Sequence, residues 1–103
     1  MKIPKTVTII GHKIKVIFKD KVLLHEKEEA GVASFNDNKI YLATKADHGE
    51  IDISNSNLTE VFLHEAIHFI DTGLGLKMKE RQVECLARGL LAFIRENNLD
   101  FRK

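Results

Sequence analysis

The chain has 103 residues, of which 44% are hydrophobic and 30% are charged, and its formal net charge is +1. A chain of this length holds a single small core, so we expect residues 1–103 to form one domain. Because the positive and negative charges nearly cancel, the composition argues against a general binder of nucleic acids or anionic membranes. We therefore expect neither nucleic acid nor a membrane as a partner.

Cysteine usage and the N-terminus indicate where the protein resides. Cys85 is the only cysteine, which excludes an internal disulfide and a cysteine-rich metal site and favours a reducing compartment. Polar and apolar residues alternate in residues 1–13, where a signal peptide would need an unbroken apolar run. With no apolar segment long enough to span a bilayer, we expect a cytoplasmic protein.

The first third of the chain has the pattern of a half-buried sheet. TVTI and HKIKVIF alternate with period two on either side of Gly11, which predicts two strands or a bent hairpin. Residues 19–30 are charged and aperiodic, and we predict a loop or a short helical turn there. GVASF and KIYLA then flank Asn36, Asp37 and Asn38, which favours a hairpin.

The sequence of the second half of the chain predicts two helices, which follow a polar connection over residues 44–55. The first helix has Asn57 or Thr59 as a candidate N-cap and Gly73 just after its last periodic residue. The second runs from about residue 78 to 97, and we expect Cys85 on it to be buried or half-buried. Its apolar arc contains Val83, Leu86, Ala87, Leu90, Phe93 and Ile94. Strands followed by helices indicate an α+β fold, with a small antiparallel or mixed sheet and then two helices.

The first helix carries the sequence HEAIH, an HExxH motif. His64 and His68 project from one face a turn apart, so both imidazoles can reach one zinc ion. Glu65 is rotated by about 100° from His64 and can deprotonate a water held by the zinc, as in HExxH metallopeptidases. The alternative is an ordinary helix that carries two histidines, but the apolar flanks indicate a buried helix, where imidazoles need partners.

A third protein ligand is expected because catalytic zinc usually takes three. The candidates are Glu80 and Glu84 on the second helix, and Glu80 lies closer to the apolar arc centred on Val83 and Ala87. We therefore predict His64, His68 and Glu80 as the metal ligands, with Glu84 as the alternative to Glu80. Each glutamate can also be read as a solvated helix residue.

Three further residues have two readings each. Asp71, one turn after His68, either orients an imidazole by accepting its N–H or is a polar residue near the helix end. Tyr41 either packs at the rim of the core or donates to an oxyanion. His48, just before the first helix, is either an exposed histidine or an electrophile from a loop.

HEAIHFID, preceded by KIYLA and followed by ERQVECLARGL, resembles the small zincin-type domains of phage and mobile-element proteins, related to the ImmA/IrrE metallopeptidases. The resemblance covers roughly residues 31–99. In that family a helix with HExxH precedes a second helix that carries an acidic ligand, and Glu80 occupies the corresponding place here. The resemblance implies a minimal zincin-like fold and a phage or mobile-element regulator as the substrate. Larger family members carry extra segments that help bind substrate or regulate activity, and we expect none of them in these 103 residues.

The sequence thus predicts a zinc-dependent metallopeptidase in which Glu65 is the general base. If the KIYLA strand lies at the sheet edge beside the metal helix, it can pair with an extended protein substrate. One alternative is a catalytically idle, zinc-stabilised module that binds a partner protein, and another is a metal-free α+β domain. Two histidines and a carboxylate suit zinc best, although iron, manganese or nickel also accept such ligands.

Overall fold

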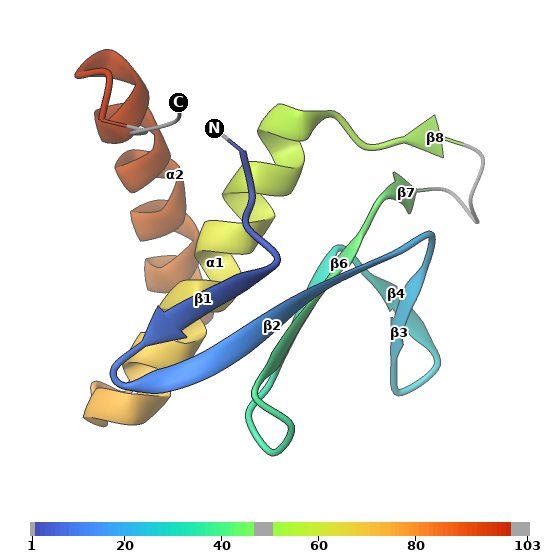
Figure 1. The fold of residues 1–103 in the computed structure, drawn as a ribbon, viewed down its shortest axis with the longest axis horizontal. Coiled ribbons are helices and arrows are strands. Elements are labelled where there is room, and N and C mark those ends of the chain that lie inside the picture. The colour runs from blue at the N-terminus through green and yellow to red at the C-terminus, as the bar shows by residue number, and fades with distance from the viewer. Residues whose placement is uncertain (1, 47–50, 100–103) are drawn as a thin grey trace.

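A computed structural model describes residues 2–46 and 51–99 of the chain. It has the predicted α+β architecture, in which a strand-rich first half is followed by two helices (Figure 1). The strands are β1 (Thr6–Ile9), β2 (His12–Lys19), β3 (Val22–Leu24), β4 (Lys27–Glu29), β5 (Gly31–Ser34), β6 (Lys39–Ala43), β7 (Lys45–Ala46) and β8 (Ile51–Asp52). The helices are α1 (Asn55–Leu74) and α2 (Glu80–Glu96). No helix in the described part is long and apolar enough to cross a membrane.

The main sheet is mixed and has the strand order β1-β2-β6-β5. The β1–β2 and β5–β6 pairs are antiparallel hairpins, as predicted, and β2 runs parallel to β6. The strand KIYLA is therefore an interior strand, so the condition under which it could pair with an extended substrate is not met. The two edge strands are β1 and β5, and β6 pairs with β5 on one side and with β2 on the other.

The prediction of a loop or helical turn over residues 19–30 is also wrong, because β3 and β4 form a two-stranded hairpin there. Its two turn residues, His25 and Glu26, both have positive φ values, of 53° and 66°. Such a two-residue turn matches the right-handed twist of the strands. The usual sequence signal for this turn is Asn-Gly or Asp-Gly, which this chain lacks.

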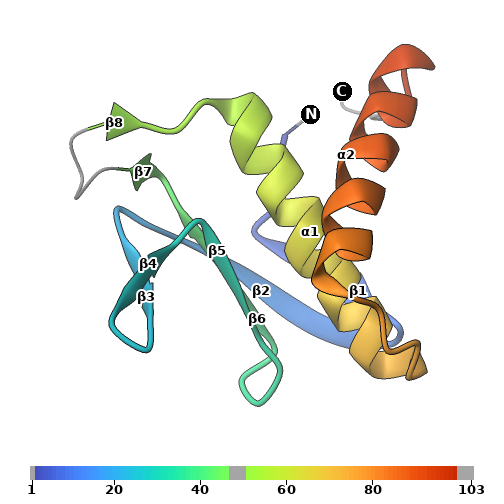
Figure 2. The ribbon, with the colours of Figure 1, turned by 180° about the vertical axis from the view of Figure 1, so that it is seen from behind.

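The core lies between the sheet and α1. Alternate residues of β2 and β6 point to this side, where they contact two phenylalanines of α1. The buried residues of this cluster are Ile14, Val16, Ile40, Leu42, Phe62 and Phe69. Figures 1 and 2 show both helices on the same side of the sheet.

The ends of α1 differ from those predicted. Its N-cap is Ser54, whose hydroxyl accepts a hydrogen bond from the Asn57 backbone N–H, so neither Asn57 nor Thr59 is the cap. Gly73 lies inside the helix, and the left-handed cap is Gly75, at φ 65°. Two glycines separated by one residue near a helix end leave the sequence signal ambiguous, since either can take the left-handed conformation.

The helix α2 packs on α1 through a narrower arc than predicted. Val83, Ala87 and Leu91 are its buried residues, while Leu86, Leu90 and Phe93 are 49%, 37% and 53% exposed. Cys85 is exposed as well, so its predicted burial is wrong. The reason is that α2 contacts α1 and has no substantial contact with the described strands, and one neighbouring helix covers only part of its apolar arc.

Candidate metal centre

The helix α1 places the two histidines of the motif on one side. His64 and His68 are one turn apart, both are half-buried, and their rings lie 4.8 Å apart between centroids at an angle of 66°. Phe62, Ile67 and Phe69, which are buried, fix the orientation of this part of α1. The histidine face is consequently held rigidly by the core on the opposite side of the helix.

The turn between the helices brings Glu80 to the histidines. Asp71 accepts hydrogen bonds through its backbone oxygen from Leu76 N–H and through its side chain from Met78 N–H. Gly75 turns the chain in the left-handed conformation, and Glu80 is the first residue of α2. Its carboxylate also lies at a helix N-terminus, where the helix dipole favours negative charge.

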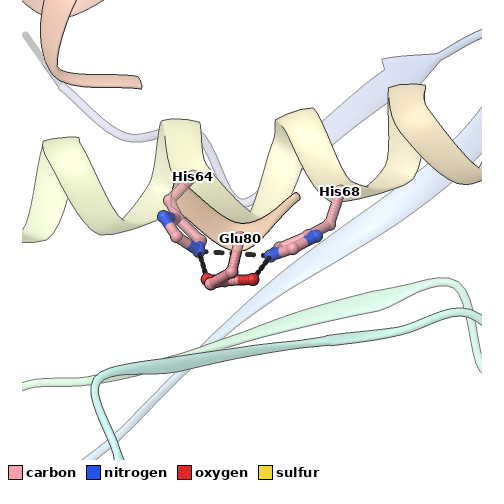
Figure 3. Close-up of side chains that lie close together, drawn as sticks. All are labelled: His64, His68 and Glu80. Carbon is pink, nitrogen blue, oxygen red and sulfur yellow. Dashed lines mark hydrogen bonds and ion pairs between the residues drawn. The ribbon is translucent and has the colours of Figure 1, made fainter. Parts of the chain in front are cut away.

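Figure 3 shows the three side chains converging on one point. Glu80 Oε1 lies 2.6 Å from His64 Nε2, and Glu80 Oε2 lies 3.2 Å from His68 Nε2. The two Nε2 atoms are 3.1 Å apart. Among the described residues these three form the one group of histidine, cysteine and acidic side chains that could hold a metal ion.

The donor set fits a transition-metal ion. Ligand atoms that surround zinc tetrahedrally at about 2.0–2.2 Å lie roughly 3.2–3.6 Å from each other. The two Nε2 atoms and the His68–Glu80 pair have separations near this value, while His64 and Glu80 are at hydrogen-bond distance. Two imidazole nitrogens facing each other at 3.1 Å are electron-pair donors that need a shared cation or proton, and a metal ion meets that need for both at once.

Glu65 faces another direction, toward the sheet edge. It is 7% exposed, and its carboxylate accepts a hydrogen bond from the backbone N–H of Ala33 on β5. Burial is the main cause that raises the pKa of Glu65 from 4.5 to about 7, followed by the negative charges of Glu80 and Glu29. A carboxyl group with a pKa near neutrality can both accept and return a proton at physiological pH.

Gly31 on β5 allows the sheet edge to approach Glu65. A Cβ atom at this position would lie 2.6 Å from Val61 Cγ1 and 3.2 Å from both Glu65 Cγ and Glu65 Oε2. The roles of Gly31 and Ala33 could not be predicted from the sequence, because they depend on how β5 packs against α1. No local sequence pattern encodes that contact.

A cleft of about 700 Å³ contains the histidines, Glu65 and Glu80. Its walls come from α1, β5, the β3–β4 hairpin and the start of α2. Several apolar side chains line it, among them Leu24, Val61 and Phe35, whose ring packs edge-on against Phe69 with centroids 4.9 Å apart. The cleft therefore combines polar groups that can do chemistry with apolar surface that can bind a ligand.

The remaining candidate residues are placed elsewhere. Glu84 lines the cleft but lies 3.8 Å from Arg88, which also approaches Glu60 of α1, and it is not part of the histidine cluster. Asp71 secures the interhelical turn, as described above. Tyr41 lies on the sheet face away from α1, beside Lys19, and this position argues against its role as an oxyanion donor. His48 lies outside the described residues.

Comparison with family models, curated proteins and solved structures finds no match to this chain. The resemblance to zincin-type domains related to ImmA/IrrE therefore stays a prediction. The centre is defined by its geometry: two imidazoles and a carboxylate converge beside a buried glutamate in an open cleft.

Proposed function

We propose that this protein is a zinc-dependent metallopeptidase that hydrolyses a peptide bond in a protein substrate. The observation that carries the proposal is the convergence of His64, His68 and Glu80 within one cleft that also contains buried Glu65. Zinc is the ion that two imidazoles and one carboxylate suit best, and this set leaves a coordination position open.

The chain's own residues divide the chemistry between them. His64, His68 and Glu80 would hold the ion, which supplies a Lewis acid that polarises a carbonyl and acidifies water. Glu65 accepts the proton of the attacking water and returns it to the leaving amine. The backbone N–H of Ala33 keeps the Glu65 carboxylate oriented between these two transfers.

The substrate backbone is proposed to run along β5. This strand pairs with β6 on one side only, and Gly31, Val32 and Ala33 line the cleft. An extended peptide can add to such an edge through main-chain hydrogen bonds, while Phe35 and Leu24 contact its apolar side chains. This geometry favours an unfolded or loop segment, and the family resemblance suggests a phage or mobile-element regulator.

The test is Glu65→Gln in the zinc-loaded protein, assayed on an unfolded casein substrate. General acid–base catalysis contributes about 10²- to 10⁴-fold, so we expect a loss of that size with zinc content unchanged. Glu84→Gln is the matched control, because Glu84 lines the same cleft outside the metal cluster. Cleavage by Glu65→Gln at the parent rate would overturn the proposed mechanism.

A second candidate function is a zinc-stabilised module that binds a partner protein without catalysis. It is favoured by the packing of α2, whose main contact among the described elements is with α1, so that an ion bridging Glu80 to the histidines would fasten the two helices. In that case the parent binds zinc but cleaves nothing, and Glu65→Gln leaves partner binding intact.

A further inference from the structure

The face of the main sheet that points away from the helices carries a set of lysines. Ile14 and Val16 of β2 point into the core, so the odd-numbered residues of this strand lie on the opposite face. We call this surface the open face. It comprises Thr6, Thr8, Lys13, Lys15, Ile17, Lys19, Val32, Ser34, Lys39, Tyr41 and Ala43, of which Ala43 is buried.

Strand register brings the lysines of the open face together. Lys13, Lys15 and Lys19 follow one another along β2, and Lys39 of β6 is the direct neighbour of Lys15. Thr6 and Thr8 of β1 are paired with Lys15 and Lys13. The result is a row of ammonium groups beside hydroxyls, all of them on one face.

Among the described residues, no acidic side chain neutralises this row. Within the described part of the chain, none of the four lysines is in an ion pair. The nearest acids in sequence lie beyond strand ends: Asp20 follows β2, and Asp37 accepts a hydrogen bond from Ser34 in the turn before β6. Like charges on neighbouring strands destabilise a sheet, so sheet stability does not account for the Lys15–Lys39 pair.

A hollow of about 180 Å³ lies beside the lysine row. Tyr41, Lys19 and Lys21 are among its lining residues, and Lys19 Nζ lies 5.1 Å from the centre of the Tyr41 ring. Lysines that track along a strand next to an aromatic ring have the two elements of single-strand binding, which are phosphate contacts and base stacking. An acidic polypeptide would use the lysines but has no planar base for the tyrosine.

We propose that the open face binds single-stranded nucleic acid. A duplex is a poorer fit, because its grooves accept a helix or a narrow ribbon and its bases are already stacked. The expectation that nucleic acid is no partner came from the net charge of +1, and that value hides how the charges are sorted. Lysines gather on the open face, whereas Glu29, Glu60, Glu65, Glu80 and Glu84 line the cleft across the sheet. This proposal is independent of the proposed peptidase activity.

The experiment measures fluorescence anisotropy of a labelled oligothymidylate of about 20 nucleotides at 50 and 200 mM sodium chloride. If four lysines each contact a phosphate, log K changes with log salt by a slope of about −2.8, so binding weakens about fifty-fold between the two conditions. The triple variant Lys13→Gln, Lys15→Gln, Lys39→Gln should bind at least about tenfold more weakly at 50 mM, with a slope near −0.7.

The matched control is Lys27→Gln, Lys77→Gln, Lys79→Gln, which changes the net charge equally at exposed lysines outside the open face. It should keep the slope of the parent. Tyr41→Leu should lose about tenfold in affinity without changing the slope. Melting temperature verifies that each variant is folded.

The proposal is overturned if the parent does not bind the oligonucleotide at 50 mM salt, or if both triple variants lose affinity equally. It is also overturned if Tyr41→Leu binds like the parent, or if the duplex, polyglutamate or phosphatidylserine vesicles bind more tightly than the single strand.

Discussion

The two faces of the main sheet hold ionisable groups in opposite ways. On the helix-covered side, Glu65 is buried, and His64, His68 and Glu80 are placed within contact of one another. On the open face, Lys13, Lys15 and their neighbours extend into solvent without acidic partners among the described residues. Glu65 on the first face is costly to bury, and the histidines and the more exposed Glu80 converge on one point, which is typical of catalytic or metal-binding residues. The lysines on the second face cost little and can contact a large, irregular ligand.

Zinc binding should have the largest effect on the helix-covered side. A ligand that binds only the folded state at about a thousand times its Kd stabilises it by about 4 kcal/mol, which in a chain of this size raises the melting temperature by roughly 15 °C or more. Thermal melts with zinc and with chelator test this. His64→Ala should lose the zinc-dependent shift, and the lysine variants of the open face should keep it.

The buried carboxyl group of Glu65 should make the metal-free protein sensitive to pH. Its pKa is raised from 4.5 to about 7, so between these values the folded chain binds more protons than the unfolded chain. The stabilising contribution is therefore fully present below pH 4.5 and is lost as the pH rises through 7, at most about 3 kcal/mol.

Glu65→Gln has no titrating group at this site, so its stability relative to the parent should increase from pH 5 to pH 8 when chelator is present. Urea unfolding of the variant and the parent at both pH values measures the difference in their free energies of unfolding. The other titrating groups are the same in both proteins, so their contributions cancel. A relative stability that is constant or falls with pH would contradict the assigned burial of Glu65.

Two glycine substitutions compare a position in the cleft with a position outside it. Gly31→Ala places a methyl group 2.6 Å from Val61 Cγ1 and close to Glu65, and should cost about 1–3 kcal/mol. Gly89→Ala on α2 meets nothing within 4 Å and should stabilise the helix by about 0.5–1 kcal/mol. Urea unfolding of both variants tests the packing of β5 on α1, and equal effects would contradict it.

The smallest effect is expected on the open face. Replacing Lys39 by Gln removes a like-charge neighbour of Lys15 and should stabilise the protein by a few tenths of a kcal/mol at low salt. The gain should disappear in high salt, because surface charges are screened. Lys27→Gln, whose cross-strand neighbour is the apolar Leu24, is the control in the same unfolding assay.

Several strands, one turn and both helices could be predicted from short patterns of neighbouring residues. The alternation around Gly11, the turn at residues 36–38 and the two long helices are all present. The position of Glu80 beside both histidines also agrees with the helical arc read from the sequence. The strands, the turn and the helices depend on period and turn chemistry, which neighbouring residues largely determine, whereas the contact of Glu80 with the histidines also requires the turn between the helices.

Features that depend on tertiary packing could not be read from the sequence. The turn at His25 and Glu26 has no glycine or asparagine, the interior place of KIYLA depends on its parallel pairing with β2, and Gly31 acquires its role only when β5 meets Glu65. The lysine row is visible in HKIKVIFK as an alternation, but which face of the sheet the helices cover depends on tertiary packing.

The central claim is that His64, His68 and Glu80 bind a metal ion, and metal content per chain tests it most directly. Protein purified without chelating resin is compared with His64→Ala, Glu80→Ala and the control Glu84→Ala by elemental analysis. We predict about one zinc ion per chain in the parent and in Glu84→Ala, with a sharp loss in the other two variants. A parent that binds no metal even when zinc is supplied, or a Glu80→Ala variant that retains it, would contradict the assignment.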